Sequence, residues 1–439
     1  MCPPLTATLV AALVIAVMPG AAVAQQQAQP ATATDSAPGA RPNSWHLSAQ
    51  AIPVLTHAQN TAEGADLTEV NLAQTALMGG ANLLAGHLRL DLTVNAEGIT
   101  MEGGELSTGA FGEGYVDRRH PHTYLHEAVA SGVGALGPVE FSLSAGRGFA
   151  AFGTDDPMVR PFEKYPINHH LQQILERLMI TGAVRYGPAI VEGSTFGGDE
   201  PDSPGSMPLT RRLGDSWSVR ATALPAPGVE LQGSYARVAS PEQREGFGLD
   251  QRKRSLSARL ISANGGRYLL AEWARTVDRD HGRNEDVFAY ESALVEGSAT
   301  VRGVSLALRF EQTERPEEER LNDPFRVPRP AADLGISGVT RWRTATAALM
   351  LPSPIFGPLR GYPFIEVERT SAQATDARSV FDAESFYGTS SPWMLTVGVR
   401  LRLGPPHARM GRYGVALPAG PPIRALGIPN GSSPSHHQH

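Results

Sequence analysis

Apolar and polar residues alternate along much of the chain between Trp45 and Gly404. Successive side chains of a β-strand point to opposite faces, so a strict alternation indicates a strand with one apolar and one polar face. The apolar faces comprise Leu88, Leu90, Leu92 and Val94 in residues 87–95, and Trp393, Leu395, Val397, Val399, Leu401 and Leu403 in residues 393–403. About ten tilted residues cross a bilayer as a strand. The pattern therefore predicts membrane-spanning β-strands.

The alternation divides the chain into sixteen candidate strands. They cover residues 44–56, 71–79, 84–95, 124–135, 139–148, 177–186, 189–197, 216–225, 228–239, 253–262, 267–277, 287–295, 298–311, 336–351, 359–371 and 391–404. No later segment approaches eighteen consecutive apolar residues, the minimum expected of a spanning helix. We therefore expect an all-β chain that crosses a membrane with strands.

The connections between these strands alternate strictly between short and long. Gly- and Pro-rich tight turns are expected at 79–80, 137–138, 187–188, 225–228, 264–266, 296–297 and 352–358. Long polar loops lie between them, at 57–70, 96–123, 149–176, 198–215, 240–252, 278–286, 312–335 and 372–390. This alternation is typical of an up-and-down antiparallel β-barrel with short periplasmic turns and long extracellular loops.

A large soluble β-protein, such as a propeller or a β-helix, is the alternative fold. Glu192 and Glu272 favour it, because each interrupts an otherwise apolar stretch. A propeller would show a repeat of a few tens of residues, and the chain has none. We therefore predict a transmembrane barrel of about 16 strands over residues 44–404.

Both ends of the chain differ from the barrel region in composition. Residues 1–24 contain an apolar run and a small-x-small cleavage site, which predicts a signal peptide; a membrane anchor is the alternative, but the run is short for a spanning helix. Residues 25–43 are rich in Ala, Gln, Pro and Thr and predict a disordered leader. Residues 405–439, rich in Pro and Gly, predict a disordered periplasmic tail.

Composition excludes several classes of function. The one cysteine, Cys2, lies in the expected signal peptide, so the mature chain would have no disulfide, cysteine metal site or cysteine nucleophile. The formal net charge of −6 is small for 439 residues and indicates no nucleic-acid partner. No motif with a catalytic mechanism is present, so we expect no enzyme and no organic cofactor.

Histidines form the densest candidate site. In an extended chain His120, His122 and His126 would point to one side, together with Ala128, Ala130 and Gly132, and would face the lumen near the extracellular mouth. His169 and His170 follow Asn168, a good helix N-cap, in the next long loop. Imidazole is a common transition-metal ligand, so the five histidines are a candidate metal site whose affinity would fall below about pH 6.5. The alternative is that they only hydrogen-bond the loops to the wall.

Charged residues are expected on the polar faces of several strands. Rings of charge tune the selectivity of a pore, but any wet barrel interior also needs polar side chains that satisfy one another. The candidate pore-lining residues are Arg89, Asp91, Arg185, Arg259, Arg309, Arg400 and Arg402. The loop 149–176, which ends in a short helical pattern, is expected to fold into the barrel and narrow it.

The segments Asp117-Arg-Arg-His-Pro-His122 and Pro166-Ile-Asn-His-His170, with residues 193–202 between two strands, resemble a group of uncharacterised bacterial outer-membrane barrel proteins. That group has an Asp-Arg-Gln-His-Pro-His stretch and a later Thr-His-His stretch; Arg119 and Asn168 replace the Gln and the Thr here. The resemblance covers mainly residues 100–220. It implies a barrel in the outer membrane and supplies no activity.

These observations predict a porin-like barrel of the bacterial outer membrane that lets small polar solutes or ions pass. At about sixteen strands a barrel is wide enough for an aqueous channel. Its expected partners are outer-membrane lipid and the solute. The alternative function is a metal-binding or structural outer-membrane protein whose lumen is plugged.

Overall fold

The computed structural model describes most of the chain from Asn43 onwards. The described residues are 43–59, 66–100, 123–154, 157–167, 169–201, 204–241, 243–280, 282–318, 336–352, 355–356, 358–375, 384, 388–405, 409–417 and 423. The expected signal peptide at 1–24 and the expected leader at 25–43, except Asn43, lie outside these residues.

The described chain is built almost entirely from β-strands. The long strands are β1 (Ser44–Ala58), β2 (Leu67–Leu83), β3 (Leu88–Asn95), β4 (Leu125–Leu136), β5 (Val139–Gly148), β6 (Arg177–Tyr186), β7 (Ala189–Phe196), β8 (Ser216–Ala226), β9 (Val229–Val238), β10 (Asp250–Ile261), β11 (Arg267–Asp280), β12 (Glu285–Val301), β13 (Val304–Glu318), β14 (Ile336–Met350), β16 (Leu359–Ala374) and β17 (Trp393–Leu403). A two-residue strand, β15 (Ile355–Phe356), lies between β14 and β16 and pairs with β16.

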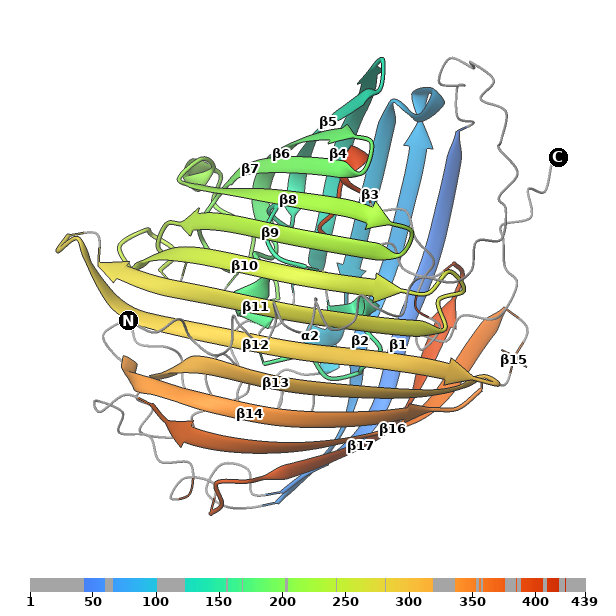
Figure 1. Cartoon of the computed structure of the whole chain (residues 1–439), viewed down its shortest axis with the longest axis vertical. Coiled ribbons are helices and arrows are strands. Elements are labelled where there is room, and N and C mark those ends of the chain that lie inside the picture. Colours follow the sequence, from blue (N-terminus) through green and yellow to red (C-terminus); the bar gives the residue numbers. More distant parts are fainter. Residues whose placement is uncertain are drawn as a thin grey trace.

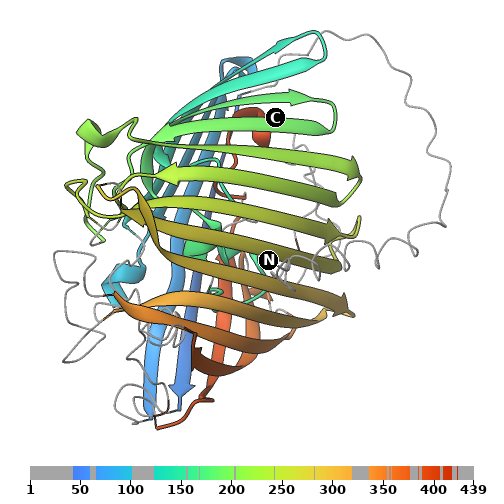
Figure 2. The same ribbon diagram turned by 60° about the vertical axis from the view of Figure 1, so that its left-hand side comes forward.

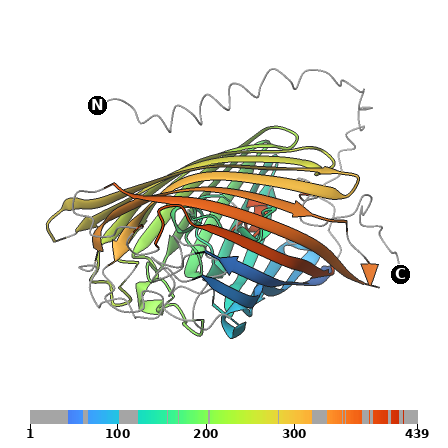
Figure 3. The ribbon, with the colours of Figure 1, turned by 90° about the horizontal axis from the view of Figure 1, so that it is seen from below.

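The sixteen long strands close into an antiparallel up-and-down barrel, which confirms the predicted fold. Each long strand pairs with its neighbour in the chain, and β1 pairs with β17 from Ala49–Leu403 to Ala58–Met394. The strands follow one another around the wall in chain order (Figure 1), and the blue β1 lies beside the red β17 where the ring closes (Figure 3). Closure pairs the backbone of both edge strands, so the sheet has no open edge.

The two faces of the wall differ as the alternation predicted. On β17 the outward Trp393, Val397 and Leu403 are exposed, whereas Thr396 and Arg400 on the other face are buried. The same division holds for β3 and β16. The apolar side chains thus form the outer surface of the barrel, and most polar ones point into its lumen.

Helices in the described residues are single turns. They are η3 (Leu84–Gly86), α2 (Glu97–Thr100), η4 (Pro157–Val159), α4 (His169–Gln172), η5 (Thr210–Arg212) and η7 (Gly414–Ala416). Within the described part of the chain, no helix has both the length and the apolar character needed to cross a membrane.

The predicted tight turn at Gly79-Gly80 is wrong, because β2 continues to Leu83 and the chain turns in η3. Gly79 pairs with Leu47 and Gly80 with His46 inside the β1–β2 ladder. A Cβ atom on Gly80 would overlap the ring of His46. The glycine pair therefore indicates close packing between two strands, which a sequence pattern does not distinguish from a turn.

The predicted turn at Glu296-Gly297 is wrong for a similar reason. Gly297 pairs with Leu269 on β11 and Leu308 on β13, so β12 runs on to Val301. The chain turns instead at Arg302 and Gly303, whose φ angles of 52° and 86° are both positive. Two positive φ angles are what a two-residue hairpin turn requires. The predicted turns at 137–138 and 187–188 are confirmed.

Candidate functional site in the barrel lumen

Two segments fold into the lumen, the loop 149–176 (the lumen loop) and residues 409–417 (the C-terminal segment). Phe152 and Phe162 of the lumen loop and Tyr413 of the C-terminal segment are almost fully buried. The C-terminal segment, red in Figure 2, lies inside the barrel and contacts β4, β5, β6 and β7 through η7. The prediction that the tail is disordered is therefore wrong for residues 409–417, because they bind the wall by the contacts described below.

The two ends of the lumen loop lie side by side where the loop leaves β5. The N–H of Ala150 donates to the carbonyl of Ile174 at 3.0 Å, and the N–H of Gly153 donates to Ser234 Oγ on β9 at 3.0 Å. Gly153 has a φ of +66°, and a Cβ atom there would overlap the carbonyl of Gln172. Only glycine fits this close approach.

We expect Gly153→Ala to release the lumen loop from the wall, because the added methyl group occupies the place of the Gln172 carbonyl. Proteolysis of the folded protein in detergent should then cut within 149–176, where the wild type resists. Gly182→Ala is the matched control: Gly182 lies on β6, a Cβ atom there meets nothing within 4 Å, and the protease pattern should not change. An unchanged pattern for both variants would contradict the expectation.

Three carboxylates of the wall bind the lumen loop. Glu272 on β11 accepts two hydrogen bonds from Arg160, at 2.8 and 2.9 Å, and all of these side chains are buried. Glu366 on β16 accepts the backbone N–H groups of residues 163 and 164 at 3.0 and 3.1 Å, and Glu311 on β13 accepts that of Ile167 at 2.9 Å. The loop therefore occupies the acceptors that these carboxylates would otherwise offer to the lumen.

Two wall arginines hold the same loop from its carbonyl side. Arg309 donates to the carbonyl of Lys164 at 2.9 Å and lies over the ring of Phe162, whose carbonyl accepts from Arg400 at 3.0 Å. Burial and the neighbouring Glu366 carboxylate raise the pKa of the loop residue Glu163 well above its ordinary value. Both sides of the loop backbone are thus bound to charged groups of the barrel.

Several N–H groups at this contact have no acceptor within the described residues. They are all buried and belong to Lys164, Arg309, Arg400 and Arg402, which we call the lumen cations. An unsatisfied buried polar group costs about 1–3 kcal/mol, and more if it is charged. The lumen cations therefore favour molecules with hydrogen-bond acceptors or negative charge beside them.

The C-terminal segment is held by ion pairs to β7 and β9 and by a hydrogen bond from β8. Arg409 binds Glu230 on β9 through two hydrogen bonds at 2.7 and 2.9 Å. Arg412 lies 3.1 Å from Glu230 and 3.3 Å from Glu192 on β7, and Glu192 also binds Arg220 on β8. Arg220 in turn donates to the carbonyl of Gly411 at 2.7 Å. The segment and the wall form one buried charge network.

Tyr413 connects the C-terminal segment to the lumen loop. Its hydroxyl donates to Glu127 on β4 at 2.7 Å and accepts the backbone N–H of Phe149 at 3.0 Å. Burial, with the adjacent Glu127 carboxylate, raises the pKa of the Tyr413 hydroxyl well above its ordinary value, so the hydroxyl keeps the proton that it donates. The two lumen segments therefore support each other as well as binding the wall.

His126 is buried beside the end of the lumen loop. Its Nδ1 lies 2.6 Å from Glu176 Oε1, and its ring packs edge-on against Phe149. The β3–β4 register shifts at this point, so beyond His126 the buried residues of β4 are Glu127, Val129 and Ser131. The prediction that Ala128, Ala130 and Gly132 face the lumen is wrong, because this bulge reverses the faces of the strand.

The predicted metal site is not tested by the other histidines and stays a prediction. His120, His122 and Asn168 lie outside the described residues. His169 Nδ1 lies 3.2 Å from the carbonyl of Pro166, and its ring lies 4.0 Å from that of His170. Among the residues that the structure describes, no three His, Cys, Asp or Glu side chains are grouped as metal ligands. His126 is brought to Glu176, at the end of the segment that contains the second histidine cluster.

The other candidate pore-lining residues also lie on the inward face. Arg89 binds Asp91 at 2.8 Å, and Arg402 donates to Gln50 at 3.1 Å. Arg185 donates to the carbonyl of Leu417 at 3.3 Å, and Arg259 lies over the ring of Tyr268. Whether these residues line a conducting pore stays a prediction.

Four residues of this site were not predicted from the sequence: Arg160, Arg220, Arg412 and Tyr413. The sequence signal for these residues was the pair Glu192 and Glu272, whose interruption of apolar stretches had favoured a soluble fold. A buried carboxylate needs a cation or a hydrogen-bond donor, and both have a cation: Glu192 binds Arg220 and Arg412, and Glu272 binds Arg160.

No protein-family model matches the chain, and no curated protein matches it. Solved structures of similar fold include the anion-selective porin from Comamonas acidovorans, with a TM-score of 0.49 and 12% identity over 83% of this chain and 100% of that one. OprB from Pseudomonas putida gives a TM-score of 0.47 and 10% identity over 84% of this chain and 94% of its own. OmpF from Salmonella typhi, in complex with daunomycin, gives a TM-score of 0.46 and 12% identity over 83% and 98%. At these values the similarities assign no solute and no mechanism.

Proposed function

We propose that this protein is a bacterial outer-membrane channel that passes small polar solutes through a narrow path, with a preference for anions. The closed sheet supports the membrane placement, since closure leaves no unpaired strand edge in lipid. Aromatic side chains lie near both ends of the strands, with Trp217 and Trp393 on the long-loop side and Trp45 and Tyr186 on the short-turn side; all are exposed. Such girdles mark the two interfaces of outer-membrane barrels.

The surplus of buried cationic N–H groups carries the proposed anion preference. The lumen loop uses the carboxylates of Glu272, Glu311 and Glu366 for its own attachment. The lumen cations keep N–H groups that bind no acceptor in the described part of the chain. Charged rings select ions in channels, so a path beside these cations favours anions over cations.

Deleting residues 152–166 tests the proposal in planar bilayers. We expect the full chain to conduct weakly and to prefer chloride over potassium in a salt gradient. The deletion should raise single-channel conductance, because the loop leaves the lumen. It should also shift the reversal potential towards potassium, because Glu272 and Glu366 lose their loop donors and become available to cations.

A silent full chain and a silent deletion variant, both shown to be folded by heat-modifiable migration on gels, would overturn the channel function. Conductance without anion preference in the full chain would overturn the selectivity alone. The plugged, structural barrel is the second candidate, and the burial of the inward side chains around both lumen segments favours it. That candidate predicts silence from both proteins.

A further inference from the structure

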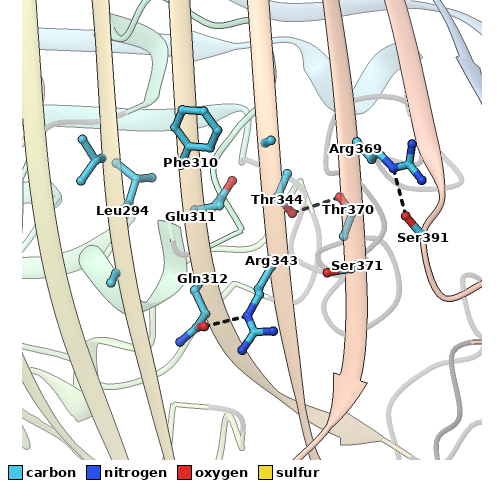
Figure 4. Close-up of a pocket in the computed structure, with 13 residues that line it drawn as sticks. Leu294, Phe310, Glu311, Gln312, Arg343, Thr344, Arg369, Thr370, Ser371 and Ser391 are labelled. Carbon is cyan, nitrogen blue, oxygen red and sulfur yellow. Dashed lines mark hydrogen bonds between the residues drawn. The ribbon is translucent and has the colours of Figure 1, made fainter. Parts of the chain in front are cut away.

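The outer surface carries a hollow of about 690 Å³ across the middle of β12, β13 and β14 and near the long-loop end of β16. Figure 4 shows its labelled side chains, with Phe310 and Arg369 in one row and Gln312 and Arg343 in another. The outward residues Ala293, Ala345 and Ser371 are small and leave space between the larger ones. The hollow therefore lies on the lipid-facing side of the wall.

The register of the sheet builds the hollow from two adjacent rows. In one row Ala293 pairs with Gln312, Gln312 with Arg343, and Arg343 with Ser371. In the next row the pairs are Val295–Phe310, Phe310–Ala345, Ala345–Arg369 and Arg369–Trp393. Two arginines thus face outward on neighbouring strands, diagonally across the ladder.

Most N–H groups of both arginines form no hydrogen bond with a described residue. Arg343 Nε donates to Gln312 Oε1 at 2.9 Å, and Arg369 Nε donates to Ser391 Oγ at 3.0 Å. Neither guanidinium forms an ion pair with any described residue, and both side chains are exposed. Two other outward arginines do have carboxylate partners: Arg237 binds Asp250 at 3.0 Å and Arg275 binds Glu291 at 3.1 Å. The hollow therefore holds two positive charges that the chain does not neutralise.

The rows on either side place the hollow at the border of the apolar surface. Towards the short-turn side, the next two rows are Leu308, Ala347, Val367 and Leu395, and then Leu306, Leu349, Ile365 and Val397. Towards the long-loop side, the next row contains Arg341, which binds Glu314 at 2.6 Å. The unpaired arginines thus lie where apolar side chains give way to charged ones, which is the level of lipid headgroups.

We infer that this hollow binds the phosphate headgroup of an anionic lipid in the outer leaflet, with its acyl chains on the apolar rows below. The inference rests on the membrane placement proposed above. Arginine is suited to phosphate, because its planar fork donates two hydrogen bonds to the oxygens. Phe310, 59% exposed, and Val295 supply the apolar floor for the first methylene groups.

Native mass spectrometry of the purified full chain in detergent tests the inference, with phosphatidylglycerol as the anionic probe and phosphatidylcholine as the neutral one. Each arginine near the headgroup level contributes about fivefold in affinity. We expect Arg343→Gln with Arg369→Gln to weaken phosphatidylglycerol binding by more than tenfold and to leave phosphatidylcholine unchanged. Arg237→Gln with Arg275→Gln is the matched control, since it removes two outward arginines that already have carboxylate partners.

Equal phosphatidylglycerol binding by the wild type and the Arg343/Arg369 variant would overturn the inference. Full competition by inorganic phosphate would also overturn it, because a free anion would then suffice. A dimer in detergent that the Arg343/Arg369 substitutions dissolve would assign the hollow to a second copy of this chain. Lipid binding is read without any current, so a silent channel with the expected lipid dependence would refute the channel function and leave this site intact.

Discussion

Removing residues 406–439 is expected to raise the single-channel conductance of the barrel several-fold. Val415 and Ala416 of the C-terminal segment lie in the short-turn half of the lumen, where they pack on Ala183 and Ile190 beside the 187–188 turn. Removal of the segment opens this half of the lumen and frees Glu192 and Glu230 from the arginines of the segment. Conductance in planar bilayers measures the effect.

The matched control is a shorter truncation that removes residues 424–439 and keeps residues 409–417 with their ion pairs. It should conduct as the full chain does. Heat-modifiable migration on gels must show that both truncated barrels are closed. If the longer truncation conducts no better than the shorter one, the C-terminal segment does not restrict the path.

The largest expected loss of stability follows from Arg160→Met. Glu272 has 0% of its side chain exposed and binds Arg160 in a two-bond geometry. Removing one partner of a buried ion pair costs about 3–5 kcal/mol, because it leaves the other charge without compensation. Urea unfolding of the refolded barrel, followed by tryptophan fluorescence, should show this decrease in the free energy of unfolding.

The double variant Arg160→Met with Glu272→Leu separates the cost of an orphaned charge from general damage. Replacing both partners with apolar residues should recover most of the lost stability, because no buried charge is left unpaired: Glu296, which lies 3.9 Å from Arg160, still binds Arg309 at 2.8 Å. Arg211→Met is the control for loss of an exposed ion pair: Arg211 and Glu245 are 57% and 64% exposed, so we expect a change below about 1 kcal/mol. A double variant as unstable as Arg160→Met alone would contradict this explanation.

The wall could be predicted from the sequence because its signal is local. Each strand carries its own alternation, as in Leu395 and Val397 facing lipid and Thr396 and Arg400 facing the lumen. The predictions of turns at Gly79-Gly80 and Glu296-Gly297 were wrong because a glycine is needed both where the chain reverses and where another strand packs closely. Local sequence does not separate these two requirements.

The lumen could not be predicted to the same extent, because its contacts join residues far apart in the chain. Tyr413 binds Glu127, and Arg400 binds the carbonyl of Phe162. A Pro- and Gly-rich tail has the composition of a disordered segment. Its Arg412 is held in place by ion pairs to Glu192 and Glu230 on the inner face of the barrel, which are far away in the sequence. The one-residue bulge at His126 also has no signal in the local sequence, although it exchanges the faces of β4.

The pairing of β1 with β17 also constrains the order in which the molecule assembles. The ring closes only when the last strand meets the first, and the C-terminal segment follows that last strand. Both ends of the barrel lie on the short-turn side, so the segment can enter the lumen without crossing the bilayer. Insertion of the segment is thus separable from closure of the wall. We therefore expect an empty, closed ring as the assembly intermediate, into which residues 409–417 then insert.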